Sequence, residues 1–153
     1  MGATVELTGN DGSRAAVKIL LVEDNPADVY LIEEALRTHS IDFKLRWIAD
    51  GEQALTTFQS DSNFDGDNLP DLILLDLNLP RVDGKEILSR IRQVGDLDHT
   101  RVAVLTSSDS PSDRRDAETL GADCYIKKPP TLDEFLAIGA VIKDLVASPR
   151  KVL

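Results

Sequence analysis

The run KILLVEDN, residues 18–25, decides the fold, because a block of apolar residues ends directly in two acids. The same form occurs three more times, in DLILLD ending at Asp76, VAVLT ending at Thr106 and CYIKK ending at Lys128. The strongest apolar blocks are continuous rather than alternating, which is typical of parallel strands covered on both faces. Ligands of open parallel sheets bind beyond the carboxyl ends of the strands. We therefore expect these polar side chains to share one crevice.

Strand-like runs alternate five times with segments of helical periodicity. The predicted strands are residues 17–22, 44–49, 72–75, 102–105 and 124–126. The predicted helices are residues 26–38, 51–59, 84–94, 111–120 and 131–147. Five successive strand-helix units predict an α/β protein with an open, doubly wound parallel sheet.

The length of 153 residues suits one domain and is too short for two comfortable ones. We expect residues 1–16 to form a flexible N-terminal segment, residues 17–147 to form the domain and residues 148–153 to form a C-terminal tail. Nothing resembling a DNA-binding or enzymatic domain follows residue 147, so the domain is expected to stand alone.

Composition argues against several classes of partner. The 17 basic and 27 acidic residues give a net charge of −10, which would repel the phosphate backbone of nucleic acids. The longest unbroken apolar runs are too short to span a membrane, and the polar start lacks the order of a signal peptide. The single cysteine, Cys124, cannot form an internal disulfide, which favours the cytoplasm and a buried apolar role for the thiol.

The acids at the strand ends indicate a cation site. Two carboxylates about 4 Å apart repel each other by about 1 kcal/mol in water and about 4 kcal/mol near a protein surface. Glu23, Asp24 and Asp76 therefore require a cation, and a few hard oxygen ligands suit Mg²⁺. The hydroxyl of Thr106 and the ammonium of Lys128 would then receive an anionic group. A phosphoryl group on one of the carboxylates fits this arrangement.

Each of these residues has a simpler interpretation when it is taken alone. Asp24 could cap the turn that follows it, and Asp76 could cap the third predicted helix, although eight residues separate the two. Thr106 could satisfy local backbone groups, and Lys128 could be a solvated surface lysine. Their order on successive predicted strands favours one shared site.

The acidic segment 59–70 has two interpretations. Its residues Asp61, Asn63 and Asp65 match the first half of a calcium-binding loop, but the Glu expected at the twelfth position is Leu72. A solvated surface insertion is the better interpretation.

The motifs KILLVEDN, LLDLNLPRVDG, VLTSSD and LGADCYIKKP together resemble the receiver domain of two-component response regulators, the CheY-like family. The resemblance covers about residues 17–147. It implies a flavodoxin-like (βα)5 fold with strand order 2-1-3-4-5. It also implies that the protein is phosphorylated by a sensor histidine kinase, and that it acts as a signalling protein rather than an enzyme on other substrates.

The resemblance assigns a role to each site residue. Asp76 would be the phosphoacceptor, and Glu23 and Asp24 would bind Mg²⁺ together with Asp76 and the backbone carbonyl of Asn78. The switch hydroxyl would be Thr106, the phosphate-binding lysine Lys128, and the aromatic that reports activation Tyr125. The neighbouring Lys127 is expected to point to solvent. The Lys128–Pro129 bond is a candidate for the cis form, as is usual in the family.

Vacating the space behind Thr106 would let Tyr125 turn inward, which would couple the site to the face of helix four, strand five and helix five. The segment EDNPADV, the long acidic loop and DLNLPRVDG resemble small regulators that partner bacterial phytochromes and related kinases. A histidine phosphotransfer protein is a further expected partner. The mixed-charge face of helix four, with Arg114, Arg115, Asp116 and Glu118, could pair across a two-fold axis to form a homodimer.

Two other functions compete with a phosphorylated receiver. An aspartate-nucleophile phosphatase of the haloacid dehalogenase type would also place an Asp at a strand end, but it needs a second Asp two residues later, where this chain has Asn78. A pseudo-receiver would bind partners without taking phosphate. Such degenerate forms usually lose an acid, the hydroxyl or the lysine, and all are present here.

Overall fold

The structure is a computed structural model that describes residues 4–8, 16–59, 64–148 and 150. Its centre is a six-stranded sheet with the order β1-β3-β2-β4-β5-β6. Five of these strands are parallel: β2 (Val17–Val22), β3 (Phe43–Ile48), β4 (Leu72–Leu75), β5 (Arg101–Thr106) and β6 (Cys124–Lys127). Numbered by themselves, the parallel strands have the order 2-1-3-4-5, so the predicted topology is confirmed.

The sheet has a sixth strand that the sequence did not predict. Strand β1 (Thr4–Thr8) pairs antiparallel with β3 at the edge of the sheet, with Thr4 opposite Ile48 and Thr8 opposite Lys44. The expectation of a flexible segment over residues 1–16 is therefore corrected for Thr4–Thr8. Residues 1–3 and 9–15 of that segment lie outside the described residues.

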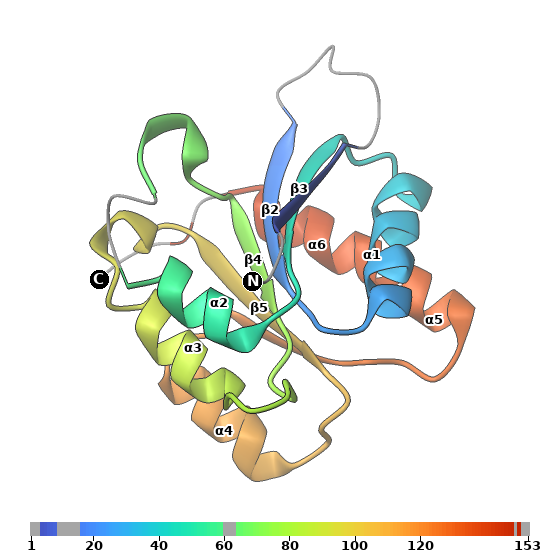
Figure 1. Cartoon of the computed structure of the whole chain (residues 1–153). Helices are drawn as coiled ribbons and strands as arrows, with labels where there is room; N and C mark the ends of the chain where they lie inside the picture. Colours follow the sequence, from blue (N-terminus) through green and yellow to red (C-terminus); the bar gives the residue numbers. More distant parts are fainter. Residues whose placement is uncertain (1–3, 9–15, 60–63, 149, 151–153) are drawn as a thin grey trace.

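Helices cover both faces of the sheet (Figure 1). One face packs against α1 (Pro26–Thr38), α5 (Leu132–Leu136) and α6 (Ile138–Val146), and the other against α2 (Gly51–Thr57), α3 (Gly84–Ile91) and α4 (Pro111–Thr119). The single helix predicted over 131–147 is divided at Ala137, where the Ala140 N–H bonds back three residues to the Ala137 carbonyl. This is a 3₁₀-type contact between two helical segments.

The two central strands carry runs of apolar residues, Ile19–Val22 in β2 and all of β4, because both faces of the sheet are covered there. Along β2, Ile19 and Leu21 face the layer of α1, α5 and α6, whereas Leu20 and Val22 face the layer of α2, α3 and α4. All four side chains are buried, as are all four residues of β4. Charged side chains are therefore kept to the ends of these buried runs, and Glu23 and Asp76 lie just beyond the carboxyl ends.

The acidic segment after α2 is anchored rather than free. Phe64 is fully buried and stacks on Phe58 with ring centroids 5.4 Å apart, and a 3₁₀ turn follows at Gly66–Asn68. Residues 60–63, which carry part of the calcium-like pattern, lie outside the described residues. Among the residues that the structure describes, the acids that could hold a metal ion lie elsewhere.

The predicted C-terminal tail also contacts the domain. The Arg150 N–H bonds to the His99 carbonyl at 3.1 Å, and Arg150 Nε lies 3.0 Å from Asp123 Oδ1. Arg150 of the predicted tail is thus held against the domain, while residues 149 and 151–153 lie outside the described residues. None of the helices described has the length and apolar character that crossing a membrane requires.

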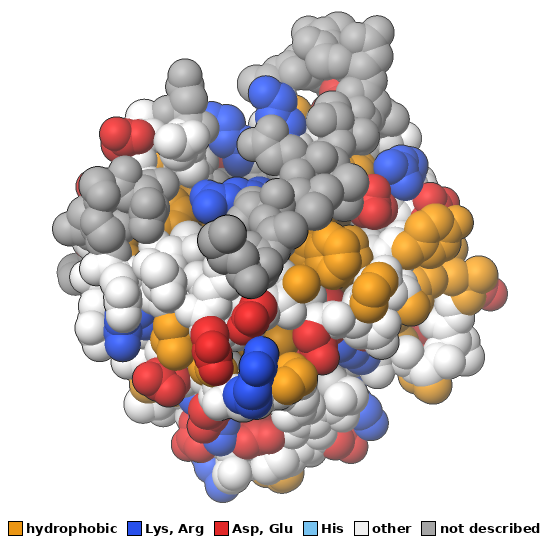
Figure 2. All heavy atoms as spheres, in the orientation of Figure 1, with side chains coloured by type: hydrophobic (Ala, Val, Ile, Leu, Met, Phe, Trp, Pro, Cys, Tyr) orange, Lys and Arg blue, Asp and Glu red, His pale blue; other side chains and the backbone are white. Residues whose placement is uncertain are grey.

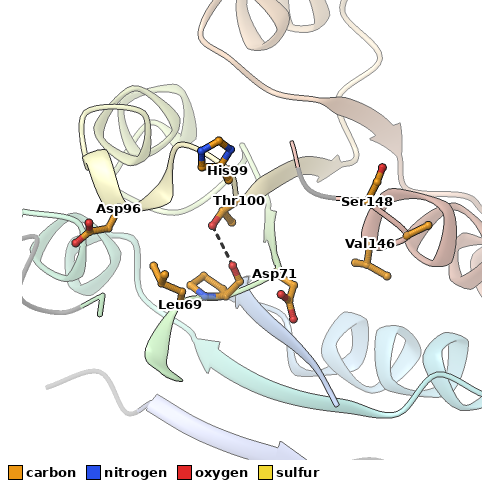
Figure 3. Close-up of a pocket in the computed structure, with 9 residues that line it drawn as sticks. Leu69, Asp71, Asp96, His99, Thr100, Val146 and Ser148 are labelled. Carbon is orange, nitrogen blue, oxygen red and sulfur yellow. Dashed lines mark hydrogen bonds between the residues drawn. The ribbon is translucent and has the colours of Figure 1, made fainter. Parts of the chain in front are cut away.

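An open cavity of about 400 Å³ lies beside this tail, at the amino ends of β4 and β5 (Figure 3). Asp71, His99, Thr100 and Val146 line it, and the Thr100 hydroxyl donates to the Pro70 carbonyl at 2.9 Å. Because the acids of the predicted site follow the carboxyl ends of the strands, this cavity lies at the opposite end of the sheet from them.

Gly84 fixes the segment that follows the site strand β4. Its N–H bonds to the Leu77 carbonyl, and an added Cβ would lie 2.4 Å from Leu77 Cα and 2.8 Å from the Asp76 carbonyl oxygen. These are backbone atoms that cannot move independently. We expect Gly84→Ala to lower the free energy of unfolding by about 1–3 kcal/mol, measured by urea denaturation.

Gly95→Ala is the matched control, because nothing lies within 4 Å of the Cβ it would add. Its stability is expected to stay within about 0.5 kcal/mol of the wild type. Equal effects of the two substitutions would contradict the close approach at Gly84.

Candidate functional site

Three carboxylates meet beyond the carboxyl ends of β2 and β4. These strands are neighbours, with Val22 opposite Leu75, so the residues that follow them, Glu23 and Asp76, are brought together. The Asp76 N–H bonds to the Val22 carbonyl at 3.0 Å and extends this pairing by one residue. Oxygens of Glu23, Asp24 and Asp76 lie within 4.8 Å of one another, and they form the one such group found among the described residues.

Burial differs among the three acids. Glu23 and Asp76 are only 1% and 4% exposed, whereas Asp24 is exposed. Burial, together with the charge of the nearby Asp76, raises the pKa of Glu23 to about 8, against the opposing hydrogen bond and charge of Lys128. Ionisation of Glu23 in this place is thus unfavourable, and a bound cation would relieve that cost.

The side-chain ammonium of Lys128 contacts this acidic cluster. Its Nζ lies 2.8 Å from Glu23, 2.8 Å from Asp28 and 3.0 Å from Asp76. Burial lowers the pKa of this lysine, but its hydrogen bonds to Asp28 and Glu23 outweigh that effect and raise the pKa above its ordinary value. Lys128 is therefore charged at neutral pH.

The neighbouring lysine points elsewhere. The Lys127 side chain is 51% exposed and pairs with Asp109 at 3.3 Å. The backbone N–H of Lys128 bonds to the Thr106 carbonyl at 2.7 Å, so β5 sets the position of the lysine that enters the site. The described residues contain no cis peptide bond, so the expected cis form of Lys128–Pro129 was wrong.

Thr106 lies fully buried at the end of β5, and its hydroxyl accepts two hydrogen bonds. The Asn78 side-chain amide donates to it at 3.0 Å, and the Ser108 N–H donates to it at 3.3 Å. The Asn78 backbone N–H also donates to Asp76 Oδ1 at 2.9 Å. Asn78 therefore connects the Asp76 carboxylate directly with the Thr106 hydroxyl.

Tyr125 lies on β6 next to the loop that follows Thr106. Its hydroxyl donates to the Ser108 carbonyl at 3.1 Å, and the Arg114 guanidinium lies 4.7 Å from the centre of its ring. The Ser108 hydroxyl in turn bonds to Asp113 of α4, which pairs with Lys85 of α3 at 2.7 Å. Polar contacts thus run from Asp76 to the helix layer on one face of the sheet.

The residues can hold a divalent cation. Glu23 Oε2 is buried and lies 2.8 Å from the Lys128 ammonium, but it has no other hydrogen-bond partner. Hard oxygen ligands of this kind suit Mg²⁺ and similar cations. The remaining groups at the site are an ammonium and a hydroxyl, which suit an anion.

Asp28 is a further residue at the site, one to which the sequence motifs gave no role. This residue lies in the first turn of α1, where an acid also suits the helix dipole. Its contact with Lys128 joins residues 100 positions apart in the chain. The only signal in the sequence was its place in EDNPADV, four residues after Asp24.

Acidic side chains gather over the lower part of the face seen in Figure 2, with a few lysines and arginines among them. This agrees with the net charge of −10 and gives the approach to the molecule a negative field on that side.

A family model described as the response regulator receiver domain matches residues 19–139. The chain belongs to this family. The response regulator Rcp1 of Synechocystis sp. is 40% identical over 126 residues, which is 82% of this chain and 86% of Rcp1. The assignment agrees with the strand order and with the position of the acidic cluster.

Solved structures of receiver domains have the same fold. A phosphorylated cyanobacterial phytochrome response regulator, RcpA, is similar with a TM-score of 0.75 and 35% identity, covering 90% of this chain and all of RcpA. The Mn²⁺-bound form of Rcp1 has a TM-score of 0.69 and 38% identity, over 84% of this chain and 92% of Rcp1.

The receiver domain of the sensor histidine kinase PA1611 from Pseudomonas aeruginosa is similar with a TM-score of 0.65 and 28% identity. The match covers 88% of this chain and all of that domain, whose structure has a magnesium ion coordinated in the active site cleft. Divalent metal binding at an acidic site therefore occurs among the structural relatives of this chain.

The burial of Glu23 leads to a test of the cation site. We expect Glu23→Gln to leave the melting temperature of the metal-free protein within about 4 °C of the wild type at neutral pH, because Gln resembles the protonated acid. In the wild type, a cation at about 100 times its dissociation constant adds about 2.7 kcal/mol of stability. The variant should lose that rise, measured by calorimetry with EDTA, Mg²⁺ or Mn²⁺.

Glu34→Gln is the matched control, since Glu34 lies on α1 and pairs with Arg37 at 3.0 Å, outside the acidic cluster. It should keep the full metal-dependent rise. A rise of normal size in Glu23→Gln would show that the cation binds elsewhere.

Proposed function

We propose that this protein is a response regulator that accepts a phosphoryl group on Asp76 from a sensor histidine kinase, in Mg²⁺-dependent two-component signalling. The observation that carries the proposal is the environment of the Asp76 carboxylate. It is buried, it adjoins two further acids, and it lies 3.0 Å from an ammonium. We place the receiver domain at residues 17–147.

Each residue has a part in the transfer. An oxygen of Asp76 attacks the phosphorus atom, while the bond from phosphorus to the donor breaks and the donor keeps the electron pair. Mg²⁺ held by Glu23, Asp24, Asp76 and the Asn78 carbonyl would neutralise negative charge on the phosphoryl oxygens. Lys128 meets the remaining charge, so positioning and electrostatics supply most of the catalysis.

The transferred group adds a charge of about −1.5 to −2 at the end of the sheet. We assign Thr106 as the switch, because its hydroxyl can leave Asn78 and Ser108 to donate to a phosphoryl oxygen. The loop at Ser108 is also where the Tyr125 hydroxyl bonds. Movement of this loop frees Tyr125 to turn inward and changes the face formed by α4, β6 and α5.

The relatives support a phytochrome-like kinase as the source of the phosphoryl group, since RcpA is described as a phytochrome response regulator. We further propose that output occurs in the cytoplasm by protein contact, with a histidine phosphotransfer protein as one partner class. The face of α4, β6 and α5 is the proposed homodimer surface.

The competing functions fit the site less well. An aspartate-nucleophile phosphatase needs a general acid two residues after Asp76, but the Asn78 amide cannot act as one and already donates to Thr106 and Ser107. A pseudo-receiver usually lacks an acid, the hydroxyl or the lysine, whereas all of them are present here. Catalysis is therefore limited to the protein's own phosphorylation and dephosphorylation.

The nucleophile is tested by intact mass after incubation with acetyl phosphate and Mg²⁺. The wild type should gain the mass of one phosphoryl group, and Asp76→Asn should gain none because its amide is a poor nucleophile. Asp71→Asn is the matched control, since Asp71 lies just before the other end of β4 and accepts a bond from the Lys18 N–H. It should be phosphorylated like the wild type.

The two rival functions have distinct outcomes in this experiment. An unmodified wild type would favour the pseudo-receiver, and undiminished labelling of Asp76→Asn would place the nucleophile elsewhere. Rapid multiple turnover of small phosphomonoesters would favour the phosphatase.

The switch is tested by hydrogen exchange with and without acetyl phosphate. Phosphorylation of the wild type should change amide exchange across residues 107–119. Thr106→Ala should still be phosphorylated but lose this change, because no hydroxyl remains to bond with the phosphoryl group. The substitution also leaves Asn78 with one fewer acceptor, which costs about 1–3 kcal/mol of stability.

Thr106→Ser is the control for that loss, since it keeps the hydroxyl and should restore the exchange change. A normal response in Thr106→Ala would contradict the role given to the hydroxyl.

A further inference from the structure

The Lys128 ammonium has three carboxylate partners, and two of them have another role. Glu23 and Asp76 belong to the acidic cluster that can hold a cation, whereas Asp28 lies outside it, in the first turn of α1. The three distances are 2.8 Å, 3.0 Å and 2.8 Å respectively. A lysine ammonium has three N–H donors, so the three contacts account for all of them.

Phosphorylation changes two of these contacts and leaves the third unaltered. A cation bound by the cluster competes with Lys128 for the oxygens of Glu23. The phosphoryl group takes an oxygen of Asp76 and presents its own oxygens to the ammonium instead. Asp28 is the partner whose oxygen is needed by neither the cation nor the phosphoryl group.

The Asp28 contact is well placed to hold the ammonium. The side chains of Lys128 and Asp28 are only 13% and 17% exposed, so salt screens their attraction less than it would at the surface. Lysine is a point charge on a flexible four-carbon stem, which has no preferred direction without such a partner. The N-terminal turn of α1 gives the carboxylate a fixed position.

We propose that Asp28 is a positioning residue for phosphoryl transfer, which holds the Lys128 ammonium over Asp76 while the other two contacts are exchanged. The inference deepens the proposed function and rests on it. Asp28 does not touch the reacting atoms and acts only through Lys128.

If Asp28 positions Lys128, its removal should lower the rate of phosphorylation, whereas if it acts only through its charge, its removal should raise that rate. Removing any acid from the neighbourhood makes the site less negative, which would speed attack on an anionic donor such as acetyl phosphate. Removing the support of Lys128 displaces the charge that stabilises the transfer, which slows it. The direction of the change therefore distinguishes the two effects.

The first measurement is the initial rate of phosphorylation by acetyl phosphate and Mg²⁺. We expect Asp28→Ala to lower this rate about tenfold, since small displacements of a catalytic group have effects of this order or larger. The rate of Asp28→Asn should lie between those of Asp28→Ala and the wild type, because the amide oxygen still accepts a hydrogen bond. A rate equal to or above that of the wild type in Asp28→Ala would overturn the proposal.

Asp109→Ala is the matched control. Asp109 pairs with the adjacent Lys127 at 3.3 Å, so this variant removes the same charge and the same kind of ion pair. Its rate should change less than about twofold, since exposed pairs contribute little. A tenfold loss in this control as well would refute a specific role for Asp28.

A double variant tests whether Asp28 acts through the lysine. In a Lys128→Ala background, Asp28→Ala should cause no further loss of rate. Additive losses would mean that Asp28 acts by another route, and would overturn the inference.

A second readout needs neither metal nor phosphoryl donor. In EDTA, reductive methylation of Lys128, followed by peptide mass, should be faster in Asp28→Ala than in the wild type, with Lys127 as the internal reference. An unchanged Lys128 rate in a folded variant would overturn the contact. If the wild type takes no phosphoryl group, the proposed function fails, while this measurement still decides the Asp28 contact.

Discussion

The parallel pairing of β2 with β4 is the constraint on which the site depends. It places Glu23 and Asp76 at adjacent strand ends, and the helix layers on both faces bury them. Neither strand could carry these acids one residue earlier, because every side chain of β4 is buried among apolar residues. The same packing that excludes charge from the sheet therefore concentrates it at one edge.

The charge of the site explains why it needs both a cation and Lys128. Glu23, Asp24, Asp28 and Asp76 would contribute −4 if all were ionised, and Lys128 contributes +1, which leaves −3 on groups that are mostly buried. Protonation of Glu23, whose pKa is raised to about 8, removes one charge when no metal is bound. A divalent cation brings the fully ionised set to −1. This balance of charge fits the proposed function, in which the site takes a metal and then a phosphoryl group.

Much of the fold followed from the sequence, because it depended on local patterns. Continuous apolar blocks identify strands that are buried on both faces, and the polar residue after each block marks the strand end. Strand β1 was missed because TVELT is short and only its pairing with β3, about forty residues later, makes it a strand. Arg150 was missed for the same reason, since its partners His99 and Asp123 are distant in sequence.

The residues of the site were likewise predicted only where a local sequence pattern marks them. Glu23, Asp76 and Lys128 were found from their positions at strand ends, and the structure brings them into contact. Asp28 was missed because it belongs to a helix and because an acid in a first helical turn needs no further explanation. Tertiary contacts between a helix and a distant strand leave no periodic pattern, so they cannot be read from one chain.

Helix α4 packs weakly against the core, and it connects the site to the face formed by α4, β6 and α5. Helix α3 buries Ile87, Leu88 and Ile91, and each such side chain contributes about 1.5–3 kcal/mol. Helix α4 buries only Ala117, so its position depends on polar contacts such as Lys85 with Asp113 and Arg114 with Tyr125.

Exposed ion pairs contribute about 0–1 kcal/mol and ordinary hydrogen bonds about 0.5–1.5 kcal/mol. In the proposed switch, the Thr106 hydroxyl gives up two hydrogen bonds, a change of the same order as one or two of the polar contacts that α4 makes. A change of this size would barely affect α3, with its three buried aliphatic side chains. In the proposed switch, α4 is the helix best suited to respond to a phosphoryl group at Asp76, because it buries the least apolar surface of the three helices on its face.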